Sequence, residues 1–320
     1  MTDAPASAAA AVAAVPPKRT AWRRLGKAPF TAWFGFAVIV FYAVLAIFAP
    51  AIAPHGESQT FDIPYEVWAF EPRLVWADLG PLSLPYWLNF EATGSMHWLG
   101  TDQIGRDMLS RLIYGARNTV GIALVTTLLA FFIGGTLGIL AAVVGKGWFE
   151  IVLNRAVDVL MAIPSLIFAL MLLSTFGSSL LNLVLIIAVL DATRVFRLAR
   201  AVAMNVAVME YVEAARLRGE GLAWIMRKEI LPNVMPPLVA EFGLRFCFVF
   251  LTIAALSFLG VGIQPPMADW GSMVRENATL ITFGDITPLL PAAAIALLTI
   301  GVNFVVDWFL NETSGLRDGQ

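Results

Sequence analysis

Residues 210–233 read EYVEAARLRGEGLAWIMRKEILPN, and this stretch decides the fold. It places charge between apolar segments that are long enough to cross a membrane. Apolar residues recur at helical spacing on both sides of Gly219-Glu220-Gly221, which predicts two short helices set at an angle. Pro232 is predicted to end the second helix. A charged helix pair between spans indicates either a docking loop or a loop that folds back on its own bundle.

The composition fixes the class of protein. Of the 320 residues, 59% are hydrophobic and only 14% are charged, and the mean hydropathy is +0.77, which is more apolar surface than one soluble core can bury. The formal net charge of −2 gives no overall field that would attract nucleic acid. Cys247, the single cysteine, lies in an apolar run and is predicted to be a small buried hydrophobe. We therefore expect an all-α polytopic membrane protein.

Six apolar segments are predicted to cross the membrane. Their ranges are 30–52, 118–144, 156–176, 180–196, 237–263 and 286–310. The third and fourth share a charge-free stretch, 159–190, which as one helix would be about 48 Å long, whereas a bilayer core is about 30 Å thick. We expect Gly177-Ser178-Ser179 to turn this stretch into a hairpin.

Basic residues predict the orientation of these spans. With a cytoplasmic N-terminus, fifteen lie on the cytoplasmic side, five on the opposite side, and Arg245 within a span. The fifteen are Lys18, Arg19, Arg23, Arg24, Lys27, Lys146, Arg155, Arg194, Arg197, Arg200, Arg216, Arg218, Arg227, Lys228 and Arg317, and the five are Arg73, Arg106, Arg111, Arg117 and Arg275. Both termini are therefore predicted to be cytoplasmic, with tails at 1–29 and 311–320. Residues 1–17 are expected to be disordered.

The connection between the first two spans, residues 53–117, is predicted to lie on the outer side of the membrane. Its aromatic residues, among them Trp68, favour anchoring at the membrane interface. Near its end, Thr101 or Asp102 is predicted to cap a helix with one apolar and one polar face. The polar face is predicted to carry Arg106, Asp107, Ser110 and Arg111. We expect this amphipathic helix to lie in the outer interface and to lead into the second span.

Some spans contain features that are expected to govern packing. Glu241 and Arg245, four residues apart, are predicted to neutralise each other. Asp158, Asp191 and Asp307 are predicted to form ion pairs near span ends, beside Arg155, Arg194 and the C-terminal region, with contact to a substrate as the alternative. The candidate kink is Pro164, and the candidate points of close helix packing are Gly134, Gly135 and Gly138.

Motifs in four places resemble a known family. Glu213-Ala214-Ala215, Gly219 and Leu231-Pro232 resemble the EAA loop of ABC importer permeases, and Ile230 stands one position later than the isoleucine of that pattern. TDQIGRDMLSRLIYGAR (101–117) and SFLGVGIQPPMADWGSMV (257–274) are similar to signature stretches of the second permease subunit of dipeptide and oligopeptide importers. DVLMAIP (158–164) is similar to the third-span entry of that subfamily. The resemblance covers about residues 30–310.

This resemblance implies a type I ABC importer permease fold, in which residues 118–310 form a five-helix core with a cytoplasmic coupling loop at 198–236. It implies import of peptides or peptide-like solutes. The implied partners are a second homologous permease, two ATP-binding subunits that hold ATP and Mg²⁺, and a periplasmic solute-binding protein. The implied coupling-loop residues are Glu213, Ala214, Ala215, Gly219, Leu222, Ile230, Leu231 and Pro232. Those expected to face the binding protein are Asp102, Gly105, Arg106, Asp107, Gln264, Pro265 and Trp270.

No GxxxxGK[ST] phosphate loop occurs in the sequence. The chain therefore cannot bind ATP by this motif, and we expect ATP hydrolysis by separate subunits. We also predict no catalytic, cofactor or metal site in this chain. Two other classes remain open. A gradient-driven secondary transporter would need acidic residues near the bilayer midplane, and a membrane scaffold would use the loop at 206–230 to bind a different partner.

Overall fold

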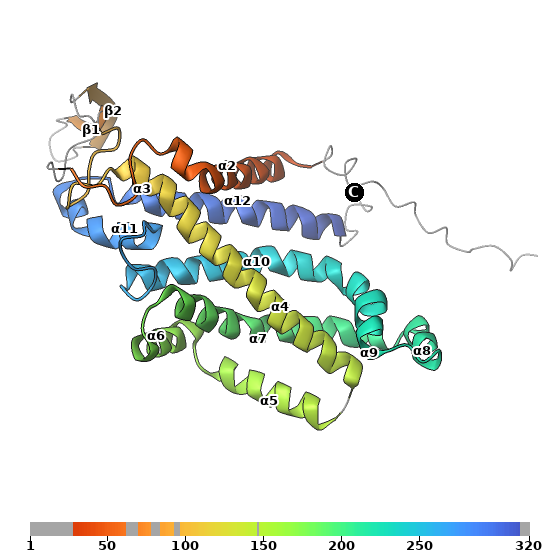
Figure 1. The fold of residues 1–320 in the computed structure, drawn as a ribbon. Helices are drawn as coiled ribbons and strands as arrows, with labels where there is room; N and C mark the ends of the chain where they lie inside the picture. The colour runs from red at the N-terminus through yellow and green to blue at the C-terminus, as the bar shows by residue number, and fades with distance from the viewer. Residues whose placement is uncertain (1–27, 62–69, 78–83, 93–96, 146, 314–320) are drawn as a thin grey trace, which may run out of the picture.

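The computed structural model describes residues 28–61, 70–77, 84–92, 97–145 and 147–313 (Figure 1). The tail predicted to be disordered, 1–17, and Trp68 lie outside these residues. Most of the described chain is helical. The long helices are α2 (Phe30–Ile52), α4 (Gly121–Val144), α7 (Leu180–Ala207), α10 (Leu231–Phe258) and α12 (Leu289–Thr313).

Several helices in the described part of the chain are long and apolar enough to cross a membrane. Four qualify alone, and a bent pair brings the number to five. The four are Phe30–Ile52, Met108–Val144, Leu222–Phe258 and Leu289–Glu312. Their outer faces carry exposed apolar side chains such as Phe41, Phe132 and Phe248, which suits a surface that contacts lipid. The predicted span at 180–196 is helical within α7, but α7 is not one of the qualifying helices, since charges from Asp191 to Arg200 fill its second half.

The predicted third span, 156–176, is not one straight helix. α5 (Trp148–Ala162) and α6 (Ser165–Phe176) meet at 90°. The break falls at Ile163 and Pro164, because proline lacks an N–H and disfavours helical backbone in the residue before it. The candidate kink at Pro164 is thus confirmed, and the turn between α6 and α7 begins at Gly177, as predicted.

Glycines bring two helix pairs into close contact. On α4, a Cβ atom at Gly134 or Gly138 would overlap backbone oxygens of α7, whereas Gly135 has open space around it. On α2, a Cβ at Gly35 would overlap the carbonyl oxygen of Gly301 on α12. The prediction of close packing therefore holds for Gly134 and Gly138 and is wrong for Gly135.

One end of the bundle, here called the cap end, holds short elements. They are β1 (Phe70–Ala77), β2 (Leu84–Ala92), α3 (Met108–Gly115), the π-helical η1 (Ala116–Val120), α11 (Trp270–Asn277) and the 3₁₀-helical η3 (Ala278–Phe283). β1 and β2 pair antiparallel, with Leu74 opposite Leu88 and an irregularity between Val75 and Trp76. The described chain is mostly helical, as predicted, but the prediction did not include this hairpin, which forms in an aromatic-rich part of the connection between the first two spans.

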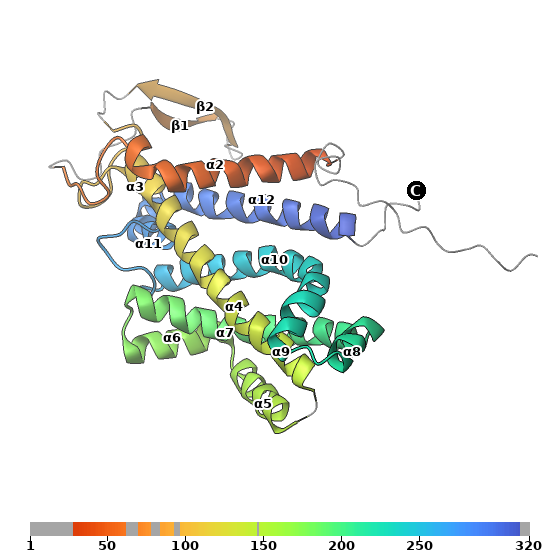
Figure 2. The same cartoon turned by 45° about the vertical axis from the view of Figure 1, so that its right-hand side comes forward.

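The opposite end, called the loop end, holds α8 (Glu210–Leu217), α9 (Leu222–Trp224) and the π-helical η2 (Ile225–Ile230). Figures 1 and 2 show that α2 begins and α12 ends at the loop end. Pro232 does not end the second helix as predicted, because η2 runs directly into α10. The wider hydrogen-bond spacing of a π-helix just before Pro232 lets the chain stay helical without that residue's N–H.

Candidate functional sites at the two ends of the bundle

The base of the loop end is apolar and buried. Val212 and Ala215 of α8 and Ile230 of η2 are fully buried, and Ile225 is 3% exposed. They pack in one cluster with apolar residues of α4, α7 and α10, among them Val143. Arg216 adds a polar link by donating to the carbonyl oxygen of Val143 at 3.1 Å. The two short helices are therefore fixed to three long ones.

The tip of the loop end is exposed. Leu217 is 83% exposed, and Tyr211 and Leu222 are each more than one-third exposed. Glu213 and Ala214 also face outward, beside the buried Ala215. These side chains form an apolar surface with charge at its edge, which we call the tip surface.

Gly219 produces the turn between the helices. Its φ of +80° lies in the left-handed region, where glycine costs least. The N–H of Gly219 donates to Arg216 O at 2.9 Å and the N–H of Glu220 donates to Ala215 O at 3.2 Å, so α8 ends in a Schellman motif. No atom lies within 4 Å of a Cβ built on Gly219, so backbone conformation and not crowding selects glycine. Gly221, by contrast, has an ordinary φ of −69°.

At the cap end, Asp102 is the centre of a buried ion-pair cluster. Arg106 Nε lies 2.6 Å from Asp102 Oδ2, and Arg111 donates to the same oxygen. Both guanidinium groups also reach Glu276 Oε2, from 2.7 Å at Arg106 and 2.9 Å at Arg111. Asp102 is fully buried and Arg111 is 1% exposed. This group, the Asp102 cluster, fastens α11 to α3 and to the loop before it.

The start of α3 differs from the prediction. Asp107 is the N-cap, accepting the N–H of Ser110 at 2.8 Å, whereas Thr101 and Asp102 lie further upstream. Asp102 instead accepts the N–H groups of Ile104 and Arg106 and shapes the turn at Gly105, where a Cβ would overlap the carbonyl oxygen of Phe61. The expected exposed polar face is absent from α3, because Ser110 and Arg111 are buried against α11 and the segment after α2.

Trp270 anchors the centre of the cap end. Its side chain is fully buried, and Nε1 donates to Leu112 O at 2.9 Å. Its ring meets Tyr42 of α2 and Phe250 of α10 edge to face, at centroid distances of 5.2 and 6.1 Å. Gln264 and Pro265, on the loop before α11, are exposed. Of the residues expected to face a binding protein, these two have free surface, whereas Asp102, Gly105, Arg106, Asp107 and Trp270 are buried.

Asp269 caps α11. Its Oδ2 accepts the N–H of Ser272 and its Oδ1 accepts the hydroxyl of Thr119, each at 2.8 Å. Burial raises the pKa of the Asp269 carboxyl above its ordinary value, and these hydrogen bonds offset only part of the increase. Nearby, Glu57 accepts from Asn118 Nδ2 at 2.6 Å and from the N–H of Ala268. Sequence reasoning missed Glu57, Asp269 and Glu276, although an aspartate directly before a helix, as Asp269 is before Trp270, is a capping signal.

A polar cavity of about 200 Å³ lies among α6, α7 and α10. Arg245 pairs with Glu241 at 2.5 Å, as predicted, and its Nη1 lies 3.6 Å from Asp191 Oδ1. Asp191 also meets the predicted Arg194, at 3.5 Å. Asp158 pairs at 2.6 Å with Arg197 of α7, not with the predicted Arg155. Cys247 is buried on α10, as expected.

Residues 134–311 match the model of a family described as the inner membrane component of binding-protein-dependent transport systems. The chain belongs to this family. Residues 17–72 additionally match the N-terminal transmembrane domain of oligopeptide transport permease C. The first match includes the tip surface, α11 and α12, so the resemblance found in the sequence motifs is confirmed. The chain is a multi-pass ABC transporter permease and not itself an enzyme.

Relatives match along most of the chain. A dipeptide transport system permease protein of Alkalihalophilus pseudofirmus is 30% identical, over 95% of this chain and 90% of the relative. The di/tripeptide permease protein of Pseudomonas aeruginosa is 34% identical over 89% and 85%, and a peptide permease protein of Escherichia coli is 35% identical over 90% and 91%. An inward-facing structure of the MetNI methionine ABC transporter aligns with a TM-score of 0.51 at 20% identity, over 62% of this chain and 94% of that chain, which shows the fold.

Proposed function

We propose that this chain is a permease subunit of an ATP-driven importer for peptides or peptide-like solutes. The relatives above are named for peptide transport, and this chain spans nearly all of their length. It crosses the inner membrane six times, with α5 and α6 forming one broken crossing and α7 another. Both termini are cytoplasmic. Helix α2 begins and helix α12 ends at the loop end, where basic residues also lie (Figure 2). Both observations support this topology.

One observation carries the coupling role of the loop end: its helices are buried at the base and exposed at an apolar tip. Burial of Val212 and Ala215 fixes α8 to the bundle. The exposed Leu217 and Leu222 leave apolar surface that water solvates poorly. A loop that folded back on its own bundle would bury this surface too. The tip surface therefore suits a groove on an ATPase subunit.

Movement of the ATPase is passed on through the buried base. Two ATP-binding subunits, which hold ATP and Mg²⁺, close around nucleotide and displace the tip surface. Because Ala215, Ile225 and Ile230 pack against α4, α7 and α10, the displacement moves these long helices as bodies. The Schellman motif at Gly219 fixes the angle between α8 and α9, so that little of the movement is lost in the loop.

The remaining partners take other surfaces. A second homologous permease completes the path across the bilayer beside this chain. A periplasmic solute-binding protein docks at the cap end, where Gln264 and Pro265 offer exposed side chains. The buried Asp102, Arg106 and Trp270 set the shape of that surface without contacting the partner.

A pair of variants tests this proposal. Leu217→Glu places charge on the tip surface, and Phe283→Glu makes the corresponding change at the cap end at a residue that is equally exposed, 83% in each case. The assay is ATP-driven uptake of a labelled dipeptide into vesicles that contain this chain, the second permease, the ATP-binding subunits and the solute-binding protein. Leu217→Glu should abolish uptake while the chain still inserts, and the ATP-binding subunits should co-purify with Phe283→Glu as they do with the wild type. Normal uptake by Leu217→Glu contradicts the coupling role.

A further inference from the structure

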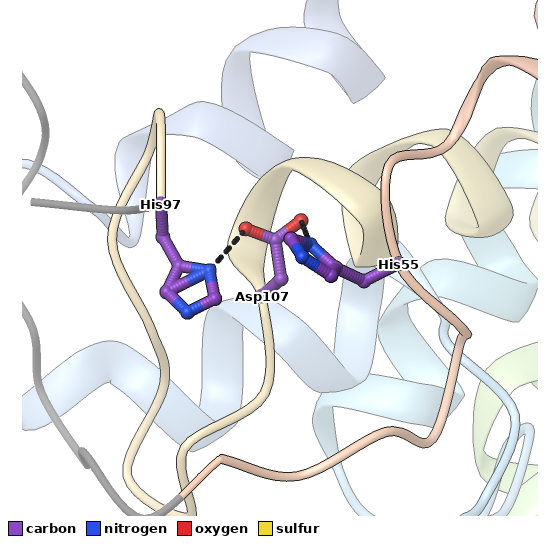
Figure 3. A group of neighbouring side chains, drawn as sticks. All are labelled: His55, His97 and Asp107. Atoms are coloured by element: carbon purple, nitrogen blue, oxygen red, sulfur yellow. Dashed lines mark hydrogen bonds and ion pairs between the residues drawn. The ribbon is translucent and has the colours of Figure 1, made fainter.

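Both histidines of the chain meet on one carboxylate at the cap end (Figure 3). His55 comes from the segment after α2, and His97 comes from the segment that leads to α3. His97 Nδ1 lies 3.2 Å from Asp107 Oδ1, and His55 Nδ1 lies 3.6 Å from Asp107 Oδ2. The Asp107 carboxylate thus lies between the two imidazoles, and both Nδ1 atoms face it.

The three side chains are held in place by their surroundings. Asp107 Oδ2 accepts the N–H of Ser110, and the N–H of His55 donates to the hydroxyl oxygen of Ser110 at 2.9 Å. The ring of Phe61 covers both imidazoles, at centroid distances of 4.9 Å from His55 and 4.6 Å from His97. Asp107 and His97 are 2% and 3% exposed. The group is therefore ordered and largely shielded from water before any ligand arrives.

His97 Nδ1 is hydrogen-bonded to Asp107 Oδ1, but hydrogen bonding among the described residues leaves His55 Nδ1 unsatisfied. The 3.6 Å separation between His55 Nδ1 and Asp107 is too long for a hydrogen bond. His55 Nδ1 is buried, and among the described residues it has no hydrogen-bond partner. A buried nitrogen in this state, directed at a carboxylate, is positioned to bind a cation together with that carboxylate.

The spacing suits a transition-metal ion. The candidate ligand atoms of His55, His97 and Asp107 all lie within 4.8 Å of one another. In tetrahedral zinc sites, metal–ligand bonds of about 2.0–2.1 Å place neighbouring ligand atoms about 3.3 Å apart. Each Nδ1 atom lies near that distance from one oxygen of the Asp107 carboxylate, 3.2 Å from His97 to Oδ1 and 3.6 Å from His55 to Oδ2.

We propose that His55, His97 and Asp107 form a binding site for a divalent transition-metal ion, with Zn²⁺ as the preferred ion. The ligands are the two Nδ1 atoms and the Asp107 carboxylate, and a water molecule takes the remaining position. Imidazole and carboxylate together suit Zn²⁺ better than the hard cations Mg²⁺ and Ca²⁺. The ion joins the segment after α2 to the N-terminus of α3, which continues into α4. This inference does not depend on the identity of the transported solute.

The test uses the full-length chain, purified in detergent with a histidine-free affinity tag and stripped of metal with a chelator. Zn²⁺ is titrated by calorimetry at neutral pH, and Co²⁺ is added in parallel because its visible spectrum reports four-coordinate geometry. The chain contains no other histidine, and its one cysteine is buried on α10, so the background from such ligands is low. We expect one ion per chain and a four-coordinate Co²⁺ spectrum.

Single variants then identify the ligands. Removing a hydrogen-bond partner of a metal ligand typically lowers affinity about 10- to 100-fold, so removing a ligand itself should lower it at least that much. We expect this loss in His55→Ala and His97→Ala, while Gln103→Ala, an exposed position in the same loop, binds as the wild type does. His55→Ala is decisive, because the His55 side chain is 30% exposed and its loss disturbs packing least. Absence of Zn²⁺ binding by the wild type, or unchanged binding by a folded His55→Ala, overturns the proposal.

Discussion

The cap end and the loop end are held together by different forces. Charged side chains are buried in the cap end, where Asp102, Arg106 and Arg111 converge with Glu276. At the loop end the buried side chains are apolar, and most charged side chains of α8 and η2 face outward. A buried ion pair is strongly destabilised when either partner is replaced, whereas apolar contacts tolerate substitutions of similar volume. The cap end is thus built as a closed structure, and the loop end as a fixed base with a surface left for a partner.

The largest predicted effect is a loss of stability when the ion-pair cluster of the cap end is broken. Arg111→Met removes one guanidinium from the Asp102 cluster and leaves Asp102 and Glu276 with one fewer buried partner. Breaking a buried pair in this way costs about 3–5 kcal/mol. Arg117→Met makes the same change six positions later, at an exposed side chain, and is the control. Unfolding by SDS in mixed micelles should show a large loss of stability for Arg111→Met alone, and equal curves for the two variants would refute a structural role for the cluster.

The next effect separates the base of the loop end from its tip. Ala215 is fully buried and its neighbour Ala214 is exposed, so one substitution can be made at both. Ala215→Leu overpacks the base and should cost about 1–3 kcal/mol. Ala214→Leu should leave the free energy of unfolding unchanged and reduce ATP-driven uptake. Stability from SDS titration and uptake in vesicles measure the two results, and loss of stability in Ala214→Leu would contradict the division into base and tip.

A smaller effect concerns the turn between the coupling helices. Gly219→Ala forces an alanine to φ of +80°, whereas Gly221→Ala keeps an ordinary φ of −69°. The difference in stability should be about 1 kcal/mol, from backbone strain alone. Both variants are compared by the same SDS titration. Equal stabilities would mean that the turn relaxes, and then Gly219 does not fix the angle between α8 and α9.

The smallest effect is a pH dependence at the cap end. Burial raises the folded-state pKa of Asp269, so the folded chain holds that proton more tightly than the unfolded chain does. Stability from this group is therefore full below the ordinary pKa of about 3.9 and falls as pH rises through the raised folded value. Asp269→Asn cannot ionise. As the pH rises above about 4, the wild type should lose stability relative to Asp269→Asn, by about the same amount at low and high salt, and the opposite slope would contradict the raised pKa.

Sequence reasoning predicted the loop end better than the cap end, for a physical reason. The turn at Gly219 and the burial of Ala215 follow from local signals, namely glycine conformation and helical spacing. The contact of Glu276 with Arg106 joins residues 170 positions apart, and no local pattern announces it. Arg111 was assigned to an exposed polar face because the sequence of its own helix does not show that Glu276, far along the chain, packs against it. His55 and His97 were missed as a pair for the same reason.

The other error concerned which prolines end a helix. Proline predicted breaks both at Pro164 and at Pro232, and only the first occurs. The two differ in what precedes them: an extended Ile163 in one case and the π-helical η2 in the other. The six predicted crossings therefore depend on how α5, α6 and α7 sit in a bilayer.

The most direct test of the central claim, that the tip surface docks an ATPase, is to isolate the tagged chain gently from native membranes and identify its stoichiometric partners by mass spectrometry. The wild type should bring down a second permease and the ATP-binding subunits. Leu217→Glu should retain the second permease and lose the ATP-binding subunits. A wild-type chain that is recovered alone, or a Leu217→Glu chain that keeps its full share of ATPase, would contradict the account.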